Sequence, residues 1–183
     1  MNAETIPLYI FDLDGTLCDI THRRHHVEKP LCQACKFKAW PTGRPVVCQN
    51  CARHQFDWKP NWPQFHADCV NDTPKPEVIT LLKHLMYGAQ ADVYIWSGRS
   101  DAVRKETKCW LERHVWGNGY AAELRMRAAG DYTPDDVLKR SWYTALSEVD
   151  QARLVCLFDD RDRVVAMYRS LGLTVLQVAP GDF

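Results

Sequence analysis

The stretch LYIFDLDGT, residues 8–16, decides the fold of this chain. Its apolar run from Leu8 to Phe11 predicts a short buried strand. Asp12 and Asp14 follow, and because side chains alternate along a strand, both carboxylates can point the same way. Gly15 permits a tight turn that a side chain would resist. Such a pair suits phosphoryl transfer, in which one carboxylate attacks phosphorus, the other handles the proton and a metal ion offsets negative charge.

Strand-like and helix-like patterns alternate along the rest of the chain. This alternation predicts an α/β fold with a Rossmann-like parallel sheet flanked by helices. The further expected strands are residues 91–96, 123–127, 153–158 and 173–178. The expected helices are residues 76–87, 101–116 and 161–171, with one more helix capped by Thr133 and started by Pro134.

Polar residues follow three of the expected strands. Asp12 and Asp14 come after the first, Ser97 after the second and Asp159 with Asp160 after the fourth. Open parallel sheets bind their ligands at the carboxyl ends of the strands. The sequence therefore predicts that these side chains converge at one edge of the sheet.

Four segments of the chain, in order, resemble the four motifs of the haloacid dehalogenase (HAD) superfamily of phosphohydrolases. They are residues 12–16, Ser97, Lys139 and the pair at 159–160. The resemblance covers nearly the whole chain apart from a cysteine-rich insertion. The alternative, that these acids only cap helices or line loops, applies better to a lone Asp-x-Asp than to four motifs in order.

The resemblance implies a role for each motif residue. Asp12 would be the nucleophile that forms an aspartyl-phosphate, and Asp14 would protonate the leaving oxygen and then activate water. Ser97 would bind a phosphoryl oxygen, and Lys139 would neutralise charge. A catalytic Mg²⁺ would be held by Asp12, the backbone carbonyl of Asp14, Asp159 and, through water, Asp160. Oxygen ligands with several retained waters are what Mg²⁺ prefers.

A closer resemblance concerns the second half of the chain. The segments at 96–100, 126–131, 135–139, 158–161 and 177–183 look like the phosphatase half of bacteriophage polynucleotide kinase–phosphatase, which removes 3′-phosphates from nucleic-acid ends. The likeness implies a substrate-binding set of Thr16, Arg23, Gly98, Arg99, Arg127 and Asp135. The arginines could instead be solvated charges or structural salt bridges. Because the chain has no Gly-x-x-x-x-Gly-Lys-Ser/Thr loop, kinase activity is not expected.

Two Cys-x-x-Cys pairs, Cys32 with Cys35 and Cys48 with Cys51, enclose a spacer of twelve residues. This spacing fits a tetrahedral Zn²⁺ site in a small zinc-ribbon-like module. Four thiolates leave no open position, so the zinc would be structural. An iron centre, disulfides and free thiols are the alternatives.

The expected organisation is a phosphatase core at 1–29 and 59–183, interrupted by the zinc module at 30–58. Insertions at this place commonly form a cap in the HAD superfamily. Basic and aromatic residues alternate in the module, so it could contact a nucleic-acid strand. Its aromatic side chains could equally pack around the metal.

Composition limits the function. The 183 residues carry no formal net charge, which gives no support for long-range attraction to nucleic acid. No apolar stretch reaches membrane-spanning length, and the first residues do not form a secretory signal. A cytoplasmic location is expected, or that of a virus-infected cell given the viral likeness. No feature calls for a protein partner.

The sequence therefore predicts a Mg²⁺-dependent phosphomonoester hydrolase acting on nucleic-acid ends, as a polynucleotide 3′-phosphatase. One alternative is a phosphatase of free nucleotides, such as a 5′-nucleotidase. A second, of a different class, is a non-catalytic nucleic-acid-binding module that works through its zinc.

Overall fold

The computed structural model describes residues 6–29, 48, 51, 58–117 and 121–181. The chain divides into two compact units. Residues Met1–Ile20 and Val70–Phe183 form the first, and Thr21–Cys69 form the second. The predicted zinc module lies within the second unit, and most of it lies outside the described residues.

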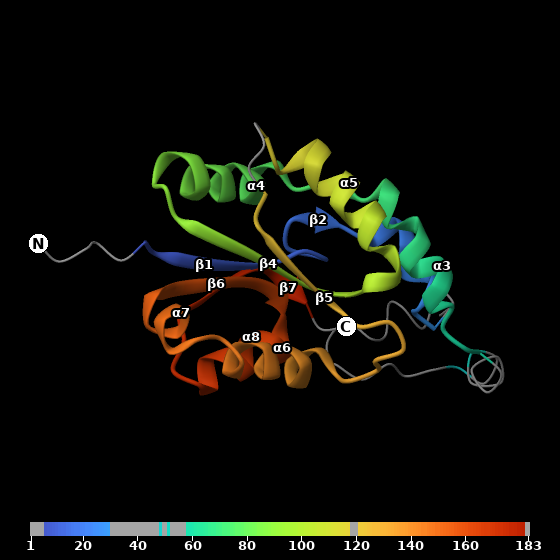
Figure 1. The fold of residues 1–183 in the computed structure, drawn as a ribbon. Coiled ribbons are helices and arrows are strands. Elements are labelled where there is room, and N and C mark those ends of the chain that lie inside the picture. Colours follow the sequence, from blue (N-terminus) through green and yellow to red (C-terminus); the bar gives the residue numbers. More distant parts are fainter. Residues whose placement is uncertain (1–5, 30–47, 49–50, 52–57, 118–120, 182–183) are drawn as a thin grey trace, which may run out of the picture. The chain divides into compact units, whose positions relative to one another are not determined.

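The first unit is built on a five-stranded parallel sheet, which confirms the predicted α/β architecture (Figure 1). The strand order is β5-β4-β1-β6-β7. The strands are β1 (Leu8–Asp12), β4 (Asp92–Ser100), β5 (Glu123–Arg127), β6 (Leu154–Arg161) and β7 (Val175–Gly181). A small antiparallel pair is formed by β2 (Cys18–Asp19) and β3 (Thr73–Pro74).

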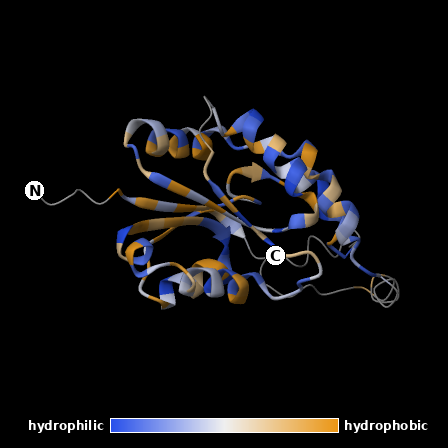
Figure 2. Cartoon of the chain, in the orientation of Figure 1, coloured by the Kyte–Doolittle hydropathy of each residue, from blue (hydrophilic) through white to orange (hydrophobic). Residues whose placement is uncertain are grey.

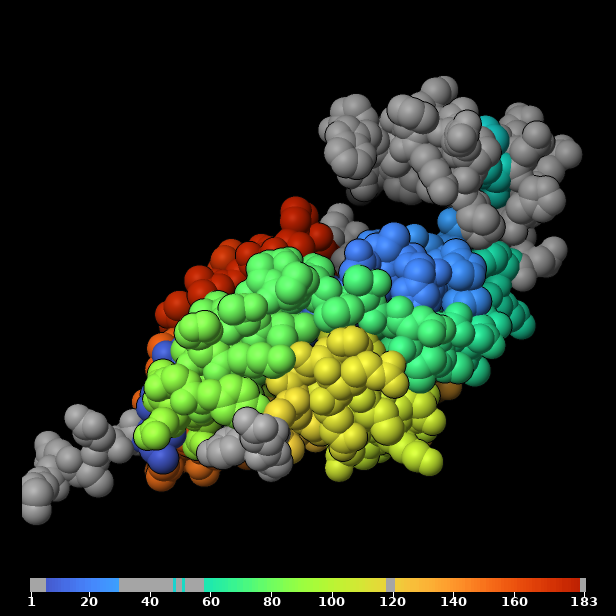
Figure 3. All heavy atoms as spheres, turned by 90° about the horizontal axis from the view of Figure 1, so that it is seen from above, coloured from blue at the N-terminus to red at the C-terminus, as the bar shows by residue number. Residues whose placement is uncertain are grey.

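Helices cover both faces of this sheet. One layer holds α4 (Pro76–Lys83) with its π-helical continuation η3 (His84–Gly88), the short turn η4 (Asp101–Val103) and α5 (Arg104–His114). Figure 3 shows α4 and α5 side by side on this face. The other layer holds α6 (Asp135–Thr144), α7 (Glu148–Arg153) and α8 (Asp162–Ser170). Elsewhere the chain forms η1 (Thr21–His26), α3 (Trp62–Ala67) and η2 (Asp68–Asn71).

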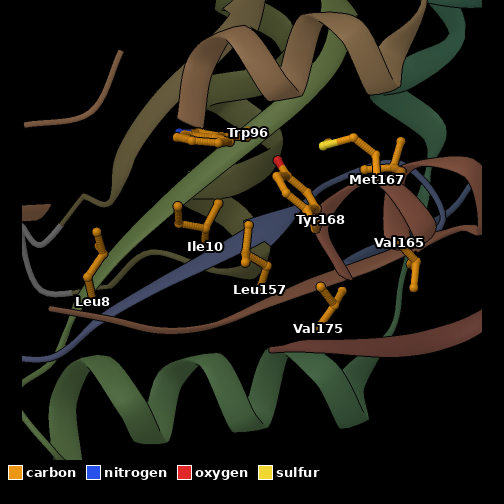
Figure 4. Packing of buried hydrophobic residues seen from close by; sticks show 9 residues of the cluster. Leu8, Ile10, Trp96, Leu157, Val165, Met167, Tyr168 and Val175 are labelled. Carbon is orange, nitrogen blue, oxygen red and sulfur yellow. The ribbon is translucent and has the colours of Figure 1, made fainter. Parts of the chain in front are cut away.

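The core lies between the sheet and its helices. Figure 2 shows hydrophobic and hydrophilic stretches in both the strands and the helices. Figure 4 shows Ile10 and Leu157, from adjacent strands, with the rings of Trp96 and Tyr168 in one cluster. This packing makes the sheet a rigid base for the residues at its carboxyl edge. Among the residues that the structure describes, no helix is long and apolar enough to cross a membrane.

Three of the expected boundaries are wrong. Strands β4 and β6 continue to Ser100 and Arg161, so that the motif residues after the expected strand ends lie within the strands. Thr133 does not cap a helix, because α6 begins at Asp135 and follows Pro134, whose side chain makes no capping bond. The Thr133 backbone is instead held by other partners: its N–H donates to Asp131 and its carbonyl accepts from Arg127.

Candidate active site

Strand register brings three of the predicted site residues together. Asp12 ends β1 opposite Trp96 of β4, so Ser97 is the next residue beyond that pair. The residue before Asp12 pairs with Phe158 of β6, so Asp159 continues beside Asp12. All three lie at the carboxyl edge, as parallel topology requires. The predicted convergence is thus a consequence of the strand order β4-β1-β6.

Three buried carboxylates share this edge. Asp12, Asp159 and Asp160 are 6%, 2% and 3% exposed, and one oxygen from each lies within 4.8 Å of the others. Burial raises the pKa of Asp12 well above its usual range, although Lys139 opposes the shift. Burial and the charge of Asp159 raise the pKa of Asp160 to about 6. The ionised forms of Asp12 and Asp160 are therefore disfavoured in this cluster.

Lys139 is the cation at this cluster. Its Nζ donates to Asp12 Oδ1 at 2.5 Å and to Asp159 Oδ2 at 2.7 Å. Burial alone would lower the pKa of Lys139, but Asp12 and Asp159 raise it well above its usual value, so the ammonium stays charged. Helix α6 positions Lys139 one turn after Asp135, with both side chains directed at the edge of the sheet.

The side chains of Asp12, Asp159 and Asp160 are suited to bind a divalent cation. Three carboxylates lie within coordination reach of one another, and burial raises the pKa values of Asp12 and Asp160. They are a donor set of the kind that hard cations bind. One ammonium does not balance three carboxylates. When bound, Mg²⁺ would supply the missing positive charge beside a phosphoryl group.

Gly15 allows the first motif to approach Asp160. Its φ is +87°, in the region that glycine adopts without strain. A Cβ on Gly15 would lie 2.0 Å from Asp160 Oδ2, so any side chain would displace that carboxylate. The next residue, Thr16, is fully buried, and its hydroxyl donates to Asp160 Oδ1 at 3.4 Å. Thr16 thus holds a carboxylate of the cluster, and its predicted contact with substrate stays a prediction.

Asp14 is held by a buried guanidinium. Arg99 Nε donates to Asp14 Oδ1 at 2.7 Å, and Arg99 Nη2 forms ion pairs with Asp14 and Asp72. Arg99 is fully buried, as is the side chain of Asp72. Burial would lower the pKa of Arg99. The charges of Asp14, Cys18 and Asp72 outweigh this effect and raise the pKa well above its usual value. Arg99 therefore forms the structural salt bridge that was considered as an alternative to substrate binding. Its contact with substrate stays a prediction.

Asp135 joins two arginines at the same edge. One of its oxygens pairs with Arg127 Nη2 and the other with Arg161 Nη1. Arg127 Nε also donates to the carbonyl of Gly98 at 2.9 Å. A Cβ on Gly98 would lie 2.8 Å from Asp135 Oδ1, so this glycine allows the carboxylate to pack against the segment that carries Ser97.

We expect Asp135→Asn to lower the free energy of unfolding by about 2 kcal/mol at pH 7, because two largely buried guanidinium groups lose their shared anion. Burial raises the pKa of Asp135, but the charges of Arg161, Lys139 and Arg127 outweigh this and lower it below 3.8. The ionised carboxylate therefore stabilises the protein at pH values above the unfolded pKa, and this contribution is lost as the pH falls through the folded pKa.

Urea unfolding at pH 7, 5 and 3 would measure this effect, with Asp136→Asn in the same helical turn as the matched control. The difference between wild type and Asp135→Asn should be the same at pH 7 and 5 and shrink at pH 3. A difference that is constant down to pH 3 would assign the loss to packing instead of charge.

The remaining predicted site residues belong to the second unit. Arg23 is fully buried there, donates from Nη1 to the Phe65 carbonyl at 3.1 Å and lies 4.2 Å from the Phe65 ring centroid. The Cys51 N–H donates to Cys48 Sγ at 3.5 Å. Cys32 and Cys35, predicted as the other zinc ligands, lie outside the described residues. The roles of Arg23 in substrate binding and of these cysteines in zinc binding stay predictions.

Two residues of the site were given no role by the sequence analysis. Asp72 lies just before the two-residue strand β3, and its backbone carbonyl accepts from Trp110 Nε1 at 2.8 Å. It meets Arg99 only because β3 pairs with β2, directly after the first motif. Arg161 follows Asp160 in β6 and lies in the segment 158–161 that resembles the polynucleotide kinase–phosphatase. Its ion pair with Asp135, seen in the structure, gives it a role.

Known proteins resemble this chain in sequence and in fold. Residues 46–183 match the family model described as the polynucleotide kinase PNKP phosphatase domain. A putative bifunctional polynucleotide kinase/RNA ligase of Autographa californica nuclear polyhedrosis virus is 27% identical over 136 residues. That alignment covers 74% of this chain but 19% of the viral protein, so the chain spans about a fifth of this relative.

Solved structures show the same fold. A Pnkp1/Rnl/Hen1 complex contains a chain with 26% identity and a TM-score of 0.62, matched over 97% of this chain and 47% of that one. A class C acid phosphatase from Bacillus anthracis, 16% identical, has a TM-score of 0.57, with 99% and 69% coverage. The magnesium-bound putative HAD-hydrolase YfnB of Bacillus subtilis, 12% identical, has a TM-score of 0.54, with 97% and 94% coverage.

Proposed function

The chain belongs to the family of polynucleotide kinase PNKP phosphatase domains and is a phosphatase of the HAD superfamily, and on that premise we propose that it removes the 3′-phosphate from nucleic-acid ends. The proposal rests on one observation: at the carboxyl edge of the sheet, Lys139 contacts Asp12 and Asp159 beside Ser97. The family match supports a nucleic-acid end as the substrate.

The proposed reaction has two steps. A carboxylate oxygen of Asp12 attacks phosphorus, the bond to the 3′-oxygen breaks, and Asp14 donates a proton to that oxygen. Water then loses a proton to the Asp14 carboxylate and attacks the aspartyl-phosphate, which releases inorganic phosphate and restores Asp12. Ser97 donates a hydrogen bond to a phosphoryl oxygen in both steps. Arg99, which contacts Asp14 in the structure, keeps that carboxylate directed at the edge of the sheet.

Charge explains why the site needs several cations. The incoming phosphate adds negative charge to three buried carboxylates, and repulsion would exclude it without compensation. Lys139 offsets part of this charge from its position between Asp12 and Asp159. In this proposal Asp12, Asp159 and the backbone carbonyl of Asp14 would hold Mg²⁺, with Asp160 assisting through water, and the ion would supply the rest of the positive charge.

Phosphate release in Mg²⁺ tests the proposal. A 3′-phosphorylated oligonucleotide, the same strand phosphorylated at its 5′ end, and free 3′- and 5′-mononucleotides would be compared in one assay. We expect kcat/KM for the 3′-phosphorylated strand to exceed that of each other substrate by at least about tenfold, since a strand offers binding contacts that a mononucleotide lacks. A preference for a mononucleotide would assign the protein to nucleotide hydrolysis instead.

The zinc module is a separate part of the proposal. With Cys32, Cys35, Cys48 and Cys51 as ligands, we expect about one zinc per chain, because two Cys-x-x-Cys pairs close a tetrahedral site. Elemental analysis of the purified protein would measure it. Cys48→Ser should lose most of the metal, whereas Cys109→Ser, at an exposed cysteine of α5, should retain it. Iron in place of zinc, or equal metal in both variants, would contradict this assignment.

A further inference from the structure

The loop between β5 and α6 presents an aromatic side chain to solvent. Tyr132 is 84% exposed, more than Val149 at 66% or Ile6 at 52% among the described residues. A single exposed apolar residue is ordinary on a protein surface. Tyr132 differs in the aromatic ring that it exposes and in the place where its loop lies.

Hydrogen bonds fix the backbone on both sides of Tyr132. The Asp131 side chain accepts from the Thr133 N–H at 2.8 Å, and the Asp131 N–H donates to Ala128 at 3.0 Å. Arg127 Nη1 donates to the carbonyl of Thr133 at 2.5 Å. Ordering an aromatic ring on such a loop costs little conformational entropy when a ligand binds, because the backbone is already held.

The same contacts attach the loop to the active site. Arg127, which holds the loop, donates to the carbonyl of Gly98, the residue after Ser97. The loop ends at Asp135, and one turn later α6 carries Lys139, which contacts Asp12. Figure 1 shows the loop on the side of the sheet to which the strands point. The loop that carries Tyr132 therefore lies at the edge where the phosphate would bind.

We propose that Tyr132 stacks on one of the last bases of the phosphorylated strand and so contributes to selection of polynucleotide ends. This inference rests on the proposed function. A base is the occupant that fits a planar ring held on a fixed loop beside a phosphate site, since stacking uses the face of the ring and works with any sequence. Tyr132 would act on binding and leave the chemistry at Asp12 unchanged.

Steady-state kinetics on three substrates test this role. We expect Tyr132→Ala to lower kcat/KM for a 3′-phosphorylated octanucleotide about 5- to 150-fold, the range that loss of one base–aromatic stack gives. Tyr132→Phe, which keeps the ring, should stay within about twofold of wild type. p-Nitrophenyl phosphate has no base, so its hydrolysis should be unchanged in both variants. Tyr87→Ala removes a less exposed tyrosine from η3, before β4 begins, and serves as the matched control.

A strand with abasic sites at its last two positions completes a double-mutant cycle. Wild type should lose activity on this strand, and Tyr132→Ala should lose little more, because the partner of the ring is already absent. An undiminished effect of Tyr132→Ala on the abasic strand, or no effect on the normal strand, would overturn the inference. Wild type that releases no phosphate from the strand but hydrolyses mononucleotides would instead overturn the proposed function.

Discussion

The Asp12→Asn variant is expected to lose phosphate release from every phosphomonoester, by a factor on the order of 10⁵, because an amide cannot form the aspartyl-phosphate. The substitution keeps the size of the side chain at the end of β1. Acid quenching during turnover of a ³²P-labelled substrate should leave label on wild-type protein and none on the variant. Asp136→Asn, which changes an acid of α6 outside the cluster, should remain active and labelled.

The same variant should be no less stable than wild type in the absence of Mg²⁺. Burial raises the pKa of Asp12 above its unfolded value even with Lys139 beside it, so its ionised form costs folding free energy at neutral pH. A neutral amide removes that cost and the repulsion from Asp159 and Asp160. Thermal unfolding in chelator would measure this, and addition of Mg²⁺ should stabilise wild type more than the variant.

An Asp12→Asn variant with phosphatase activity within about tenfold of wild type would contradict the assignment of Asp12 as the nucleophile.

The sheet could be predicted because its signals are local. The apolar runs that become β1, β4 and β6 each precede or contain polar motif residues at the expected places. A parallel sheet then brings its carboxyl ends together whatever the details of the helices. Strand ends were less predictable, since Ser97 and Asp159 continue the hydrogen-bonded ladder although their side chains are polar.

Ion pairs between distant segments could not be predicted. Arg99 meets Asp14 across 85 positions and Asp72 across 27, and no periodicity connects these residues. Arg127 and Arg161 share Asp135 only because β5 and β6 end, and α6 begins, at the same edge. A resemblance can mark an arginine as important, but only the contacts show what it binds. Arg99 binds the carboxylates of Asp14 and Asp72.

Arg99→Met should lower the free energy of unfolding by about 3–5 kcal/mol, because the fully buried carboxylate of Asp72 loses its cation. Methionine fills much of the volume of the arginine stem, so the loss reports charge more than packing. Urea unfolding at pH 7 would measure it. We also expect activity to fall, since Asp14 loses the guanidinium that holds its carboxylate.

The double variant Arg99→Met/Asp72→Asn separates these two effects. With no charge left at position 72, at least about 2 kcal/mol of the lost stability should return, because a buried ion pair replaced by neutral groups is far less costly than one broken in half. Activity should not return, since Asp14 still lacks its partner. A double variant that regains both stability and activity would show that Arg99 serves the fold alone. A single variant as stable as wild type would contradict the buried pair between Arg99 and Asp72.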